Sequence, residues 1–125
     1  MTNAQPGVRV LVVEDEMMLA MLMEDMLADI GHTPVGPVTR VDNALKMIDE
    51  GGFDAAILDI NLNGQDSYPV ADALTAQAIP FVFASGYSAG RLREKYRAIP
   101  SVQKPFLQSE LQRVLNTALS THAQV

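Results

Sequence analysis

The pattern of apolar and polar residues along the chain switches repeatedly between a strand-like and a helix-like period. Short apolar runs predict five strands, at residues 8–13, 33–38, 54–60, 81–86 and 101–104. Apolar residues at helical spacing predict a helix after each strand, at residues 14–31, 41–51, 68–78, 88–98 and 107–119. Strand and helix therefore alternate five times. This alternation predicts a doubly wound parallel sheet with helices on both faces and right-handed crossovers.

The ends and faces of several elements can also be predicted. We expect Asp15 to cap the first helix and Gly31 to end it. Pro34 and Pro37 weaken the second strand, and the fourth helix is poorly amphipathic. The helix residues expected to face the core are Leu19, Leu22, Met23, Met26, Leu27, Ile30, Val41, Ala44, Leu45, Ile48, Leu107, Leu111, Val114, Leu115 and Leu119.

Length and composition are those of one acidic globular domain. The 125 residues fit a single domain, with a core over residues 7–120 and short disordered ends. The net charge of −6 argues against nucleic-acid or anionic-membrane binding, which needs a basic surface. The chain has no cysteine, which excludes disulfides and thiolate metal sites. It shows neither a signal peptide nor an apolar run long enough to span a membrane, so we expect a cytoplasmic protein.

Polar residues stand at the carboxyl ends of four of the five predicted strands. In open parallel sheets ligands bind at this edge, so these residues should converge. Three carboxylates so close together cannot all stay ionised without a cation, so either some are protonated or a divalent ion lies among them. Oxygen ligands without His or Cys favour Mg²⁺. The strand-end residues are Glu14, Asp15, Asp59, Ser85, Gly86, Lys104 and Pro105.

The remaining strand-end groups suit a phosphoryl group. The Lys104 ammonium can pair with phosphoryl oxygens, and the Ser85 hydroxyl can donate a hydrogen bond to another phosphoryl oxygen. Gly86 lets backbone N–H groups approach closely. Asp59 then acts as the nucleophile that forms an acyl phosphate.

Each of these groups also has a purely structural interpretation when it is taken alone. The acids after the first strand could stabilise a helix N-terminus, Asp59 and the Ser85-Gly86 pair could form turns, and Lys104 could simply be solvated. A chance placement of all four groups at successive strand ends is the weaker explanation, so we favour the phosphoryl site.

Four segments together resemble the receiver domain of two-component response regulators: LVVEDE, AILDINLNG, FASGY and QKPF. The likeness covers nearly the whole chain. It implies the flavodoxin-like (βα)₅ fold with strand order 2-1-3-4-5. It also implies that Asp59 accepts a phosphoryl group from a phosphohistidine, on a sensor histidine kinase or a histidine phosphotransfer protein.

The resemblance also implies individual roles at the site. Asp15 and Asp59 are expected to contact Mg²⁺ directly and Glu14 through water, with the backbone carbonyl of Asn61 as a further ligand. The Lys104–Pro105 peptide bond is expected to be cis. The implied phosphoryl-binding residues are Ser85, Gly86, Lys104 and Asn61.

Two features depart from a typical receiver. Typical receivers carry a switching Tyr or Phe three positions before the lysine, where this chain has Ser101. The segment FASGYS resembles the receiver subgroup named for its Phe-Ala-Thr-Gly-Tyr run, which also lacks that aromatic residue. We expect Tyr87 to replace the missing ring as a gate or as part of a remodelled loop. The alternative is a half-exposed tyrosine that packs on the fourth helix.

Only the short segment STHAQV follows the last predicted helix. We therefore expect a stand-alone receiver that signals through a protein partner or exchanges phosphoryl groups. It is not expected to be an enzyme in its own right. The basic side chains of the fourth helix could dock an acidic partner, although a solvated helix is the simpler interpretation. They are Arg91, Arg93, Lys95 and Arg97.

The first helix contains five of the seven methionines. Core filling explains Met23 and Met26. Met17, Met18 and Met21 are harder to place in a core, and we expect them to face a partner such as a kinase helix bundle.

Two other function classes compete with the receiver interpretation. A metal-dependent phosphohydrolase could also use a strand-end aspartate, but such enzymes usually place a second aspartate where this chain has Asn61. A receiver-like module without phosphorylation would be expected to lose Asp15, Asp59 or Lys104, and all three are present.

Overall fold

The computed structural model describes residues 7–86 and 92–123. Its main sheet has five parallel strands in the order β2-β1-β3-β6-β7. A separate antiparallel hairpin, β4–β5, follows β3 in the chain. Without the hairpin strands, this order is the predicted 2-1-3-4-5, which confirms the flavodoxin-like fold. The strands are β1 (Arg9–Val13), β2 (Thr33–Val38), β3 (Ala55–Leu58), β4 (Asn61–Leu62), β5 (Gln65–Asp66), β6 (Phe81–Ser85) and β7 (Ser101–Gln103).

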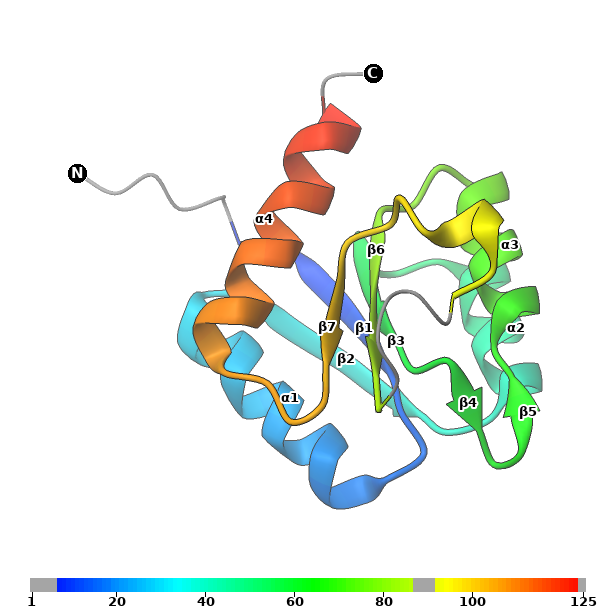
Figure 1. The fold of residues 1–125 in the computed structure, drawn as a ribbon, viewed down its shortest axis with the longest axis horizontal. Helices are drawn as coiled ribbons and strands as arrows, with labels where there is room; N and C mark the ends of the chain where they lie inside the picture. Colours follow the sequence, from blue (N-terminus) through cyan, green and yellow to red (C-terminus); the bar gives the residue numbers. More distant parts are fainter. Residues whose placement is uncertain (1–6, 87–91, 124–125) are drawn as a thin grey trace.

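Helices cover both faces of the sheet, as the alternating pattern predicts. Figure 1 shows α1 and α4 on one side of the sheet and α2 and α3 on the other. Each pair closes its own apolar core, one around Met23, Leu27 and Leu115 and the other around Ile48, Leu74 and Phe83. The helices are α1 (Met17–Ile30), α2 (Val41–Glu50), α3 (Tyr68–Ala76) and α4 (Gln108–Ala123). Within the described residues, no helix is long and apolar enough to cross a membrane.

The register of the two central strands determines where the functional edge lies. Val13 of β1 pairs with Leu58 of β3, so both strands end at the same level of the sheet. The amide of Asp59 donates to the carbonyl of Val13 over 3.0 Å. Glu14 and Asp59 are therefore held side by side as the first residues beyond the strands.

The predicted cap of α1 is wrong, although the predicted end is confirmed. The helix begins at Met17 with Glu16 at the N-cap, while the Asp15 carboxylate accepts a hydrogen bond from the Asn63 amide. Gly31 ends the helix in the left-handed conformation, at φ 106°. Asp15 does not cap the helix because its carboxylate is engaged by the hairpin.

The predicted helix over 88–98 is also wrong over its described part. Residues 92–98 contain only a 3₁₀ helix, Glu94–Tyr96, and residues 87–91 lie outside the described residues. The buried residues here are Leu92 and Tyr96, which are four positions apart with exposed charged residues between them. Two anchoring side chains hold a short turn against the core but do not provide the apolar stripe of a longer helix.

Three leucines predicted to face the core are exposed instead: Leu22, Leu45 and Leu107. The buried line of α1 runs through Ala20, Met23 and Leu27. Leu22 lies one residue before Met23, and one residue turns an α-helix by about 100°, which points its side chain away from the sheet. Leu107 precedes α4 and is 67% exposed.

His32 provides a test of the core through pH. Its Nδ1 atom accepts a hydrogen bond from the Val8 amide, and burial lowers the pKa of the ring. Below about pH 6.5 His32 therefore binds a proton more readily in the unfolded chain than in the folded chain. The free energy of unfolding falls as the pH falls. We expect His32→Asn to lose less unfolding free energy between pH 7.5 and 5.5 than the wild type, as measured by urea denaturation. His122→Asn, which changes the other histidine, is the control. Equal losses in all three proteins would contradict this assignment.

Candidate functional site

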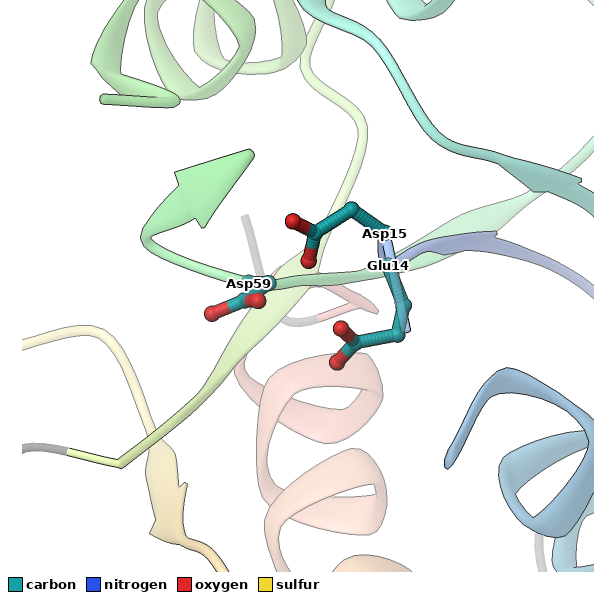
Figure 2. Close-up of side chains that lie close together, drawn as sticks. All are labelled: Glu14, Asp15 and Asp59. Carbon is teal, nitrogen blue, oxygen red and sulfur yellow. The ribbon is translucent and has the colours of Figure 1, made fainter. Parts of the chain in front are cut away.

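Three carboxylates converge at the carboxyl edge of the two central strands. Glu14 and Asp15 follow β1, and Asp59 follows β3. One carboxylate oxygen from each lies within 4.8 Å of the other two, and Figure 2 shows the three side chains close together. Glu14 and Asp59 are buried and Asp15 is partly exposed. The strand-end acids predicted from the sequence therefore form one cluster, open to solvent on the Asp15 side.

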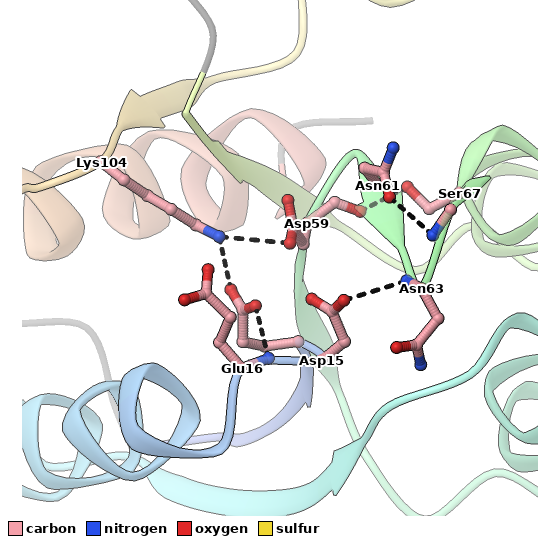
Figure 3. A network of polar contacts seen from close by, with 9 residues as sticks. Asp15, Glu16, Asp59, Asn61, Asn63, Ser67 and Lys104 are labelled. Carbon is pink, nitrogen blue, oxygen red and sulfur yellow. Dashed lines mark hydrogen bonds and ion pairs between the residues drawn. The ribbon is translucent and has the colours of Figure 1, made fainter.

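Lys104 reaches the same cluster from the end of β7, as Figure 3 shows. Its Nζ atom donates to Glu14 Oε1 over 2.7 Å and to Asp59 Oδ2 over 3.2 Å. The side chain of Lys104 is only 14% exposed. The Lys104 amide donates to the Ser85 carbonyl over 2.7 Å, and the Lys104–Pro105 bond is cis. One ammonium thus faces three carboxylates, which leaves an excess of negative charge.

Burial shifts the pKa values of this cluster. It raises the pKa of Glu14 to about 7, because hydrogen bonds from Lys104 and from the Glu16 amide only partly offset the lost hydration. Burial also raises the pKa of Asp59, against the opposing charge of Lys104. Burial alone would lower the pKa of Lys104, but its bonds and charge interactions with the two acids raise it. The two acids are therefore costly to ionise in the absence of a further cation.

A β-hairpin that the sequence analysis missed lies over the acidic cluster. Its two-residue turn is Asn63-Gly64, with φ of 51° and 85°. Positive φ at both positions is the type I′ geometry, for which Asn-Gly is the strongest short sequence signal. The Asn63 amide donates to Asp15 Oδ2 over 2.9 Å, and its side chain donates to the Thr39 carbonyl. The hairpin therefore fixes Asp15 and places Asn61 beside the site.

Ser67 is a second residue that the sequence analysis missed. It is fully buried between the hairpin and α3, and its hydroxyl donates to the backbone carbonyl of Asp59. The only available sequence signal was its position before Tyr68-Pro69, which is typical of a helix N-cap.

The other predicted site residues occupy the neighbouring strand ends. Ser85 closes β6 and is buried, and Gly86 follows it with open space where a Cβ would lie. The close backbone approach expected at Gly86 is therefore not required by the surrounding protein atoms. Ser101 begins β7 opposite Phe83. Tyr87 lies outside the described residues.

Four aromatic rings surround the start of α3 and the 3₁₀ helix. Tyr68 and Tyr96 stack with centroids 5.6 Å apart, and Phe81 and Phe83 make edge contacts with Tyr96. Arg93 lies over the Tyr68 ring. The described basic side chains of this segment contact their own chain, through the pairs Arg93–Asp66 and Lys95–Asp72 and the bond from Arg97 to the Leu92 carbonyl.

Comparison with known proteins assigns the family. The sequence model of the response regulator receiver domain matches residues 10–116. The chain belongs to this family. Receiver domains are signalling regulators that bind Mg²⁺ in an acidic pocket, and this chain has an acidic cluster formed by Glu14, Asp15 and Asp59.

The solved structures that resemble this receiver include those of SdrG and PhyR. SdrG from Sphingomonas melonis Fr1 is 44% identical with a TM-score of 0.80, and the match covers 95% of this chain and 99% of that one. A second SdrG structure, in its BeF₃-activated conformation, is 46% identical with a TM-score of 0.76, over 89% of this chain and 94% of that one. PhyR from Brucella abortus is 27% identical with a TM-score of 0.84, over 97% of this chain and 51% of that one.

The curated relatives are longer than this receiver. The transcriptional regulatory protein PdtaR of Mycobacterium tuberculosis is 28% identical over 130 residues, which cover 99% of this chain and 63% of that protein. TcrA from the same species is 40% identical over 73 residues, 58% of this chain and 28% of that protein. The chain spans less than two thirds of the length of either relative.

Replacing Lys104 tests the charge balance. In the wild type the raised pKa of Glu14 means that stability falls as the pH rises through about 7. Lys104→Met leaves two buried acids without their ammonium, so we expect a further loss of about 1–3 kcal/mol at pH 8 and a smaller loss at pH 5. Urea denaturation without divalent cations measures both. Lys95→Met, which removes an exposed pair with Asp72, is the control and should show little change. A loss for Lys104→Met that is independent of pH would contradict this account.

Proposed function

We propose that this receiver accepts a phosphoryl group on Asp59 from a phosphohistidine of a histidine kinase or a histidine phosphotransfer protein. The observation that carries the proposal is the position of the Asp59 carboxylate, which accepts a hydrogen bond from the Lys104 ammonium and lies close to the other two acids. A nucleophilic oxygen is thus close both to a fixed positive charge and to a set of oxygen ligands. Such a site can position the reacting group and neutralise its charge, which is most of what phosphoryl transfer requires.

The donor set fits Mg²⁺. All three clustered side chains offer hard oxygen ligands, and Lys104 cancels only part of their charge. We assign direct contacts to Asp15 and Asp59, a water-mediated contact to Glu14, and a further contact to the Asn61 carbonyl. When bound, the ion neutralises charge on the phosphoryl oxygens.

The chain's own residues then carry the transfer. A carboxylate oxygen of Asp59 forms the new bond to phosphorus while the N–P bond of the phosphohistidine breaks, and the imidazole leaves with the electron pair. Lys104 and Ser85 hold the phosphoryl oxygens, and Gly86 contributes its backbone amide. The phosphoryl group of the product carries about two negative charges and lies beside the Lys104 ammonium.

The remaining details of the signalling proposal follow from the sequence. The motif around Ser85 supports membership of the Phe-Ala-Thr-Gly-Tyr subgroup, and the proposed switching residue is Tyr87 in place of the aromatic residue that is absent at Ser101. Output passes through a protein partner in the cytoplasm or by phosphoryl exchange. Asn61, where a phosphohydrolase usually has its second aspartate, disfavours the enzyme alternative.

An apolar surface on α1 is the proposed kinase contact. Met17, Met18 and Met21 are 53%, 87% and 59% exposed, and Leu22 is exposed beside them. Figure 1 shows that α1 begins close to the end of β1, and the acids directly follow β1, so the first turn of α1 adjoins the site. Flexible thioether side chains adapt to a helical partner.

Incubation with a small-molecule phosphodonor and Mg²⁺ tests the acceptor. We expect the wild type to gain one phosphoryl group by intact-mass measurement, because the donor needs no protein partner. Asp59→Ala should gain none, while Asp54→Ala, which changes an exposed acid paired with Arg9, should react as the wild type does. Continuous turnover of the donor would favour the hydrolase, and no uptake by any protein would favour a phosphorylation-independent module.

Alanine at Met17, Met18 and Met21 together tests the kinase contact. With any histidine kinase that phosphorylates the wild type, we expect transfer to slow by about tenfold or more, because contacts at the centre of an interface dominate its affinity. Phosphorylation by the small donor should stay unchanged. Leu45→Ala, on the exposed face of α2, is the control. Unchanged kinase transfer to the triple variant would rule out this surface.

A further inference from the structure

Ser67 is the N-cap residue of α3, but its side chain does not cap the helix. It precedes α3, and its carbonyl accepts hydrogen bonds from the amides of Val70 and Ala71. A serine at this position usually accepts a hydrogen bond at its side-chain oxygen, worth about 1 kcal/mol. The Ser67 side chain makes no cap hydrogen bond. The hydroxyl therefore does not contribute the stabilisation that an N-cap serine usually provides.

The hydroxyl instead donates to the backbone carbonyl of Asp59, as Figure 3 shows. On the other side of the same residue, the Asp59 amide donates to Val13. Both peptide groups that flank the Asp59 α-carbon are thus anchored, one to the sheet and one to α3. With the backbone fixed on both sides, the direction of the carboxylate toward Lys104 is restricted.

Ser67 also closes the hairpin that carries Asn61. The Ser67 amide donates to the carbonyl of Ile60 over 2.7 Å, so the residues before and after the hairpin are bonded to each other. Because Asn61 is the next residue, the direction of its carbonyl depends on the same closure. One buried serine therefore restrains both the proposed nucleophile and a proposed metal ligand.

We infer that Ser67 is a positioning residue for Asp59, and that it acts through the backbone without touching the phosphoryl group. This inference rests on the proposed phosphorylation of Asp59. Loss of the hydroxyl leaves the Asp59 carbonyl without this donor and frees the peptide plane that it held. Changes in groups that orient metal ligands typically cost about 10–100-fold in affinity or activity.

Ser67→Ala is the direct test, at a temperature where urea denaturation shows each protein to be fully folded. We expect phosphorylation by the small donor at saturating Mg²⁺ to slow by about tenfold and Mg²⁺ to bind several-fold more weakly. Ser67→Cys keeps the volume and a weak donor, so both values should lie between those of Ser67→Ala and the wild type. The matched control is Thr75→Val, which removes another hydroxyl that donates to a backbone carbonyl on α3, at Ala71. It should stay within twofold of the wild type.

The outcomes separate positioning from a structural role. If Ser67 is merely structural, Ser67→Ala should be less stable, but the folded variant should have the same Mg²⁺ affinity and phosphorylation rate as Thr75→Val. That result would overturn the inference. If Ser67→Ala does not fold, Ser67→Cys decides alone, and wild-type values in it would also overturn the inference. If the wild type takes up no phosphoryl group, the proposed function fails. The Mg²⁺ affinities and the NMR shift of the Asp59 carbonyl carbon then decide the role of Ser67.

Discussion

The charge imbalance at the carboxyl edge of the sheet is the constraint on which the site depends. Three carboxylates face one ammonium, and two of these acids are buried. Two unit charges about 4 Å apart interact by about 4 kcal/mol at an effective dielectric of 20, so Lys104 cannot offset every repulsion in the cluster. Burial, with a smaller contribution from the charge of Asp59, raises the pKa of Glu14 to about 7. A divalent cation bound here would cancel the remaining excess, which would make cation binding and carboxylate ionisation two parts of one equilibrium.

The rest of the fold keeps these charges in place. Parallel pairing of β1 with β3 brings the acids together, and pairing of β6 with β7 brings Lys104 to them from the neighbouring strands. The hairpin then holds Asp15 from above through the Asn63 amide. None of these contacts is strong alone, but each holds a charged group at the edge of a sheet that is packed between two apolar cores. Densely packed cores resist movement of the strands.

The sequence predicts the sheet and most of the site for the same reason. Buried strands have a clear apolar signature, and the residue that ends each strand must lie at one edge of a parallel sheet. Asp59 and Lys104 are 45 residues apart, yet their strand-end positions alone bring them together. What the sequence does not predict depends on contacts between irregular segments. The Asn63-Gly64 turn had a usable local signal. The donation from Ser67 to Asp59 did not, because it depends on which of two possible partners a buried hydroxyl selects.

The short 3₁₀ helix Glu94–Tyr96 shows the same dependence on contacts that local pattern cannot reveal. Tyr96 stacks on Tyr68 and donates from its hydroxyl to Asp72, and the Arg93 amide donates to the Tyr68 hydroxyl. These contacts fix residues 93–96 against α3 without a continuous apolar stripe. Tyr68 directly follows Ser67 in the chain. The first turn of α3 is therefore bonded on one side to the backbone of Asp59 and on the other to the segment that precedes β7. Two adjacent residues, Ser67 and Tyr68, thus join the backbone of the acidic cluster to the surface formed by residues 93–96.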